Sequence, residues 1–143
     1  MHFEISVDID AAPETVWNLL KDVERWPEMT ASITSVEILD RPFALSSRAR
    51  VSQPKLPAAV WKVTAFEENK TFTWESRSPG VTTVAAHDIL PKPDGTVSVR
   101  LTLDQKGFLS PVLSLLTGRL TRRYVTMEAN GLKSKSEPHP TPN

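Results

Sequence analysis

The apolar positions of this chain recur with two different periods, and the changes of period mark the elements that we expect. Residues 3–10 alternate apolar and polar side chains without a break, which is typical of a half-buried strand. Apolar residues then recur at helical spacing from Pro13 to Val23. The pair Trp26-Pro27 ends or kinks this helix, because the residue before a proline avoids the helical region. A second short helical turn around residues 25–30 fits the same segment.

From residue 34 to residue 105 the period stays close to two. This alternation predicts six strands, at residues 34–38, 48–53, 59–66, 71–77, 81–90 and 96–105. Short polar turns such as Ser78-Pro79-Gly80 separate them, so consecutive strands should pair as an antiparallel meander. In the 59–66 strand, the alternation places Trp61, Val63 and Ala65 on one face.

The last periodic segment predicts one long helix over residues 109–133. Ser110 is the expected N-terminal cap, and Pro111 suits the first helical position. A stripe of side chains at spacings of three and four should be buried, and it comprises Leu109, Val112, Leu113, Leu116, Leu120, Tyr124 and Met127. Arg119, Arg122 and Glu128 fall largely on the opposite side. Gly118 interrupts the apolar residues in the middle of the helix, which favours either a kink or a close ligand there.

A long helix with one apolar face needs a broad apolar partner, and the preceding strands supply one. We therefore expect an α+β domain over residues 1–133, in which a seven-stranded antiparallel sheet wraps around the C-terminal helix and short helices follow the first strand. Residues 134–143 contain three prolines and no large apolar residue, so we expect a flexible, solvated tail. A helix lying in a curved sheet leaves space for a ligand cavity.

Strand alternation identifies the side chains that should face this cavity. With the helix residues of the predicted stripe, the candidate ligand-binding set is Gln53, Trp61, Trp74, Ser76, Thr83, Ala85, His87, Leu113, Leu116, Leu120 and Tyr124. Most of these side chains are apolar or aromatic, and a few can form hydrogen bonds. Such a lining is typical of pockets that hold small hydrophobic molecules.

Composition narrows the function further. The 17 basic and 17 acidic side chains cancel, and the basic ones are scattered among strands, which argues against a nucleic-acid partner. The chain has no cysteine, and it shows neither a leader pattern nor an apolar run long enough to span a membrane, so we expect a cytoplasmic protein. No phosphate-binding glycine loop, dinucleotide fingerprint or pair of histidines at metal-ligand spacing is present. We expect no metal and no cofactor, and either a monomer or a homodimer.

Several short motifs, in a fixed order, also resemble a known family. They are Ala12-Pro13-Glu14-Thr15-Val16-Trp17, Arg25-Trp26-Pro27-Glu28, Val60-Trp61-Lys62-Val63, Phe72-Thr73-Trp74, Ser78-Pro79-Gly80-Val81 and Leu120-Thr121-Arg122-Arg123-Tyr124. In this order the chain is similar to the polyketide cyclase/dehydrase and START-related (SRPBCC) superfamily. The resemblance implies the helix-grip fold of the major birch-pollen allergen, with a hydrophobic cavity between sheet and helix. It implies no single activity, since relatives include lipid carriers, cyclases and hormone receptors. The segment Ala44-Leu45-Ser46-Ser47 departs from the glycine that relatives usually carry there.

Two functions follow from these expectations. The first is a carrier that binds a small hydrophobic molecule, lipid-like or polyketide-like. The second is a cofactor-free cyclase or dehydratase, in which His87 and Tyr124 would be the catalytic residues that move a proton. The structural alternative for His87 is a buried histidine bonded to a neighbouring strand, and for Tyr124 a core aromatic whose hydroxyl is satisfied elsewhere.

Overall fold

Seven strands and one long helix form most of residues 1–138, the part of the chain that this computed structural model describes. The elements in chain order are β1 (His2–Ile9), α1 (Pro13–Lys21), the 3₁₀ helix η1 (Val23–Glu28), β2 (Ser35–Ile38), β3 (Arg48–Ser52), β4 (Ala59–Glu67), β5 (Thr71–Ser78), β6 (Val81–Pro91), β7 (Val97–Lys106) and α2 (Ser110–Ser136). The predicted α+β order is confirmed, including the short helices after the first strand. No helix within this described part is both long and apolar enough to cross a membrane.

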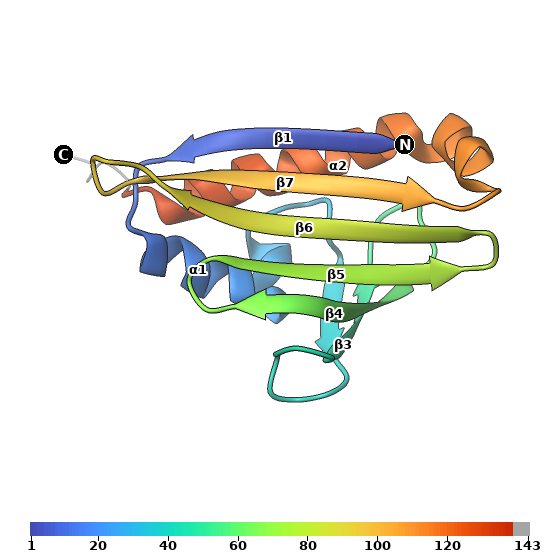
Figure 1. The fold of residues 1–143 in the computed structure, drawn as a ribbon, viewed down its shortest axis with the longest axis horizontal. Helices are drawn as coiled ribbons and strands as arrows, with labels where there is room; N and C mark the ends of the chain where they lie inside the picture. The colour runs from blue at the N-terminus through green and yellow to red at the C-terminus, as the bar shows by residue number, and fades with distance from the viewer. Residues whose placement is uncertain (139–143) are drawn as a thin grey trace.

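The strands form one antiparallel sheet in the order β1-β7-β6-β5-β4-β3-β2. Consecutive strands from β2 to β7 are neighbours, as short turns require. The segment containing α1 and η1 carries the chain from β1 at one edge to β2 at the other. Helix α2 runs along β1 and β7 on the same face of the sheet as α1 (Figure 1). The sheet therefore has one helix-covered face, and the core and the cavity lie on it.

The alternation of β4 is broken at one point. The register between β4 and β5 shifts between Val63 and Ala65, which marks a bulge. Val63 is buried, Ala65 is exposed, and Phe66 takes the inward position and packs edge-on against Trp17. The expectation that Ala65 shares a face with Trp61 and Val63 was therefore wrong, because the extra residue reverses the side-chain directions after it.

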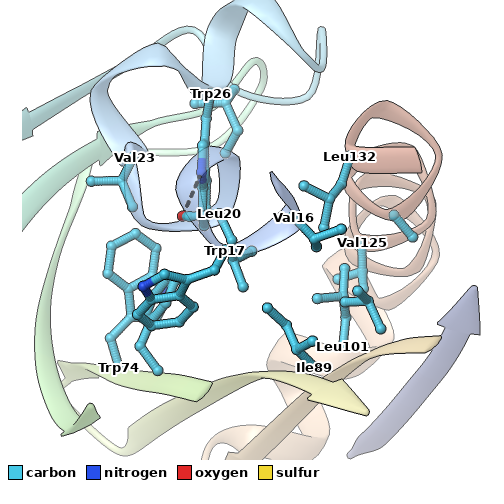
Figure 2. Close-up of a cluster of buried hydrophobic side chains, with 14 of the residues drawn as sticks. Val16, Trp17, Leu20, Val23, Trp26, Trp74, Ile89, Leu101, Val125 and Leu132 are labelled. Atoms are coloured by element: carbon cyan, nitrogen blue, oxygen red, sulfur yellow. Dashed lines mark hydrogen bonds between the residues drawn. The ribbon is translucent and has the colours of Figure 1, made fainter. Parts of the chain in front are cut away.

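Side chains from α1, η1, α2 and the sheet meet in one hydrophobic core (Figure 2). Trp17 of α1 is fully buried, and Trp26 of η1 donates its indole N–H to the carbonyl oxygen of Leu20 at 3.0 Å. The hydrogen bond to Leu20 satisfies the only polar group of the Trp26 side chain, so the whole ring can pack inside. Figure 2 shows Leu132 of α2 close to Val16 of α1.

Helix α2 begins as predicted near residue 110 but is not capped as predicted. The N-cap residue is Leu109, and no side chain caps the first turn; Ser110 is already helical. The helix also continues to Ser136, three residues past the expected end. Glu137 accepts hydrogen bonds from the amide of Asp10 at 2.9 Å and from the ammonium group of Lys133. Residues 134–137 are thus tied to the domain, whereas residues 139–143 of the predicted tail lie outside the described residues.

The buried face of α2 differs from the predicted one. Leu116 is 75% exposed and Val112 is 52% exposed, while Leu132 is 1% exposed. The residues that are buried are Ser110, Gly118, Tyr124, Val125, Ala129, Leu132 and Ser136. This stripe is shifted by one residue, about 100° around the helix, from most of the predicted one. The first half of α2 carries leucine and valine on several sides, so its periodicity does not define a single face.

Small residues help to decide which face packs. A Cβ atom at Gly131 would lie 2.2 Å from the carbonyl oxygen of Met29, so only glycine allows the helix to come this close. Gly118 also faces inward, but a Cβ atom there would meet Ser114 Oγ at 3.4 Å and Met1 Sδ at 3.6 Å. The atoms nearest to that position therefore belong to Ser114 and Met1, and Gly118 does not line the cavity.

Candidate functional site

A cavity of about 220 Å³ lies between the concave face of the sheet and α2. Nine of the predicted side chains line it, namely Gln53, Trp61, Trp74, Ser76, Thr83, Ala85, His87, Leu113 and Tyr124. Leu116 and Leu120 do not line it. Because the buried stripe is shifted, Leu116 is mostly exposed, and Leu120 is only partly buried. The cavity exceeds the volume of about 150 Å³ at which an apolar cavity in another protein holds benzene.

Aromatic rings form the inner wall of the cavity. Trp74 of β5 lies between Trp61, with ring centroids 5.7 Å apart, and Trp26, which meets it edge-on at 5.4 Å. All three indoles line the cavity. Such contacts fix the rings in place, so the wall is a rigid apolar surface against which a flat molecule can stack.

His87 lies on β6 opposite Phe72 of β5 in the sheet register. Its Nδ1 atom is 3.0 Å from the carbonyl oxygen of Phe72. A carbonyl oxygen can only accept, so Nδ1 carries the proton and Nε2 is an acceptor. Burial lowers the pKa of His87 to about 4, although the bond to Phe72 acts in the other direction. The imidazole is therefore neutral near pH 7.

Tyr124 links α2 to the loop that follows β3. Its hydroxyl donates a hydrogen bond of 2.5 Å to the carbonyl oxygen of Pro54. Leu56 and Pro57 of the same loop line the cavity. The tyrosine proton is thus already engaged, and the bond holds the loop against the helix. Gln53 is similarly engaged, since its amide nitrogen donates to the carbonyl oxygen of Ser32 at 3.3 Å.

Glu128 lines the cavity, so the prediction that it lies on the side of α2 opposite the buried stripe was wrong. It borders the main cavity and also a small adjoining one between Trp26 and Leu132. Burial raises the pKa of its carboxyl to about 7. The signal that could have found it is the spacing, because Glu128 follows Tyr124 by four residues, one turn along the same face.

Comparison with known proteins agrees with this architecture. The family model described as polyketide cyclase / dehydrase and lipid transport matches residues 1–137. The chain belongs to this family. A curated relative from Streptomyces cyaneus, described as a putative polyketide cyclase, is 32% identical over 60 residues, which are 42% of this chain and 40% of that protein's length.

Two solved structures share the fold of this chain. A START superfamily protein from Mycobacterium smegmatis superposes with a TM-score of 0.73 at 18% identity, covering 94% of this chain and 97% of the other. Ginseng major latex-like protein 151 from Panax ginseng gives a TM-score of 0.77 at 13% identity, covering 96% and 98%. The helix-grip fold of this polyketide cyclase/dehydrase family member is therefore shared with plant and bacterial proteins of low identity.

Few ionisable side chains line the cavity of this family member. Within residues 1–138, no group of three or more metal-binding side chains comes together. The titratable side chains lining the main cavity in this described range are His87, Tyr124 and Glu128.

Proposed function

We propose that this protein binds one small apolar molecule in the cavity between the sheet and α2. The observation that carries the proposal is the cavity itself, about 220 Å³ of space in the interior of a small domain and walled by Trp26, Trp61 and Trp74. An apolar molecule that fills this space would remove its aromatic walls from water, which is favourable. Membership of a family described by lipid transport as well as cyclisation supports the same function.

Native mass spectrometry of the purified protein tests this proposal first, since a retained apolar molecule would appear as an added mass. A second test fills the cavity. Ala85→Leu places extra methyl groups among the lining side chains, whereas Ala65→Leu adds the same groups at an exposed position of β4. Ala85→Leu should weaken the binding of an environment-sensitive apolar dye at least tenfold, and Ala65→Leu should not change it. Equal dye binding in both variants would contradict the proposal.

A cofactor-free cyclase is the second candidate, and the description of the Streptomyces cyaneus relative favours it. In this function His87 and Tyr124 would transfer protons to and from a folded polyketide chain. Two observations favour the binding function over it. Burial holds the pKa of His87 at about 4, well below the range of an efficient base at pH 7, and the Tyr124 hydroxyl already donates to Pro54.

Turnover of aromatic polyketide intermediates by wild type and His87→Gln distinguishes the two functions. A carrier should convert none of them, and His87→Gln should change its ligand affinity by less than about tenfold. An enzyme that uses His87 should lose turnover by about 10² to 10⁴ with little change in binding.

A further inference from the structure

Glu128 of α2 is an acidic side chain on the cavity lining. It borders both the main and the adjoining cavity, and His87 and Leu101 line the same two spaces. Within residues 1–138, no hydrogen bond or ion pair reaches its carboxyl, and burial is the sole cause of its raised pKa. Glu128 is partly buried, and most of the side chains that line the small adjoining cavity with it are apolar, so its carboxyl borders the cavity in largely apolar surroundings.

Two carboxyls elsewhere on the protein have cationic partners. Glu24 pairs with Arg41, and Asp40 pairs with Arg48, and these bonds lower the pKa of both carboxyls. An enclosed carboxyl without such a bond is costly, whereas an apolar side chain of similar size would pack there without that cost. A donor group on a bound molecule would supply the missing hydrogen bond.

The other polar groups around the cavity are hydroxyls, amides and one neutral imidazole, and none of them is a cation. The Nε2 atom of His87 is unprotonated, and the side-chain oxygen of Gln105 has no hydrogen-bond partner in the described part of the chain. No lysine or arginine among residues 1–138 lines either cavity. A ligand that carries a carboxylate would bring a second negative charge beside Glu128 with no counter-charge, which is unfavourable in an enclosed site.

We infer that Glu128 is the polar anchor of the site, so that the cavity takes apolar molecules bearing a hydroxyl or ammonium group and rejects those bearing a carboxylate. This inference rests on the proposed binding function and adds its selectivity. The apolar body of the ligand packs against Trp61 and Trp74, and its donor group reaches Glu128 at the far end. Fatty acids and other apolar carboxylates are poor ligands for this reason.

Four compounds with one bicyclic body test the inference: 2-naphthylmethanol, 2-naphthylmethylamine, 2-naphthoate and 2-methylnaphthalene. Their dissociation constants are measured by calorimetry at pH 8, where Glu128 is largely ionised. Wild type should bind the alcohol and the amine at least tenfold more tightly than the carboxylate. Glu128→Gln preserves the size of the side chain and removes its charge. It should weaken the amine at least tenfold, strengthen the carboxylate and leave 2-methylnaphthalene unchanged.

Glu14→Gln, at an exposed position in the first turn of α1, is the matched control and should leave all four constants unchanged. The wild-type series alone tests the selectivity if Glu128→Gln does not fold. Binding of all four compounds with similar affinity would overturn the inference and leave the proposed binding function standing. Failure of all four to bind wild type at their solubility limits would overturn both.

Discussion

His87 and Phe72 are joined in two ways across the centre of the sheet. Their rings stack with centroids 4.2 Å apart, and the His87 Nδ1–H donates to the carbonyl oxygen of Phe72 at 3.0 Å. The stacking holds the imidazole in an apolar environment, while the hydrogen bond fixes its tautomer. Together they make His87 a neutral acceptor at the cavity wall, which is the structural role expected of a buried histidine bonded to a neighbouring strand.

Acid should remove the stabilising contribution of His87. Burial lowers the folded-state pKa from 6.5 to about 4, so the unfolded chain binds more protons between these values. The contribution is complete above pH 6.5 and is lost as the pH falls through 4. The free energy of unfolding of wild type relative to His87→Gln should fall by up to about 3 kcal/mol between pH 7 and pH 4. Urea denaturation at several pH values measures this, and parallel profiles would contradict it.

Glu128 should have the opposite pH dependence. Its folded-state pKa is raised from 4.5 to about 7, so the folded protein binds more protons between these values. Its contribution is complete below pH 4.5 and is lost as the pH rises through 7. Glu128→Gln, which cannot ionise, should therefore become more stable relative to wild type by up to about 3 kcal/mol between pH 4.5 and pH 8. The same urea titrations measure it, and a constant difference would refute the burial of this carboxyl.

Two leucines of α2 should differ sharply in their contribution to stability. Leu132→Ala removes a side chain that is 1% exposed and leaves a cavity, so it should cost about 2–5 kcal/mol. Leu116→Ala removes one that is 75% exposed and should change stability by less than about 0.5 kcal/mol. Chemical denaturation of the two variants compares them directly. A large loss in Leu116→Ala would place this residue in the core, as the leucine periodicity had predicted.

Two glycines of the same helix provide a second matched pair. Gly131→Ala forces a Cβ atom against the carbonyl oxygen of Met29, so the helix must move and stability should fall by about 1–3 kcal/mol. Gly118→Ala meets no atom closer than 3.4 Å, and the higher helix propensity of alanine should make it neutral or stabilising by up to about 1 kcal/mol. Thermal unfolding distinguishes the two, and equal effects would contradict this account of the helix packing.

The strands could be predicted from the sequence because each of them has one face turned to the core. Phe72, Trp74 and Ser76 are buried on alternate positions of β5, and the pattern predicts their common face directly. The bulge at Val63 could not be predicted, since nothing in the residues around it requires an extra position. The family resemblance also covered nearly the whole chain, and it agrees with the family match.

The helix face, and with it part of the site, could not be predicted in the same way. Leu113, Leu115 and Leu116 lie on different sides of the first turns of α2. Of these three, only Leu113 lines the cavity, because packing against the sheet determines which side of the helix faces it. Glu128 was predicted to lie opposite the apolar stripe of α2, and it lines the cavity because the buried stripe is shifted by about one residue. The residue whose predicted position was wrong is thus the acidic residue of the cavity lining.

The burial of α2 is uneven along its length, and this predicts which end of the helix is held least firmly. Its last turns carry Ala129 and Leu132 and the close approach at Gly131, whereas its first turns expose Val112, Leu115 and Leu116 to water. Local unfolding requires least free energy where the fewest apolar contacts are broken, so we expect any transient detachment of α2 to begin at its N-terminal end. Leu113 and Thr117 of that end line the cavity. Fraying of these first turns would therefore open the cavity to solvent, while the better-packed C-terminal turns would hold the fold together.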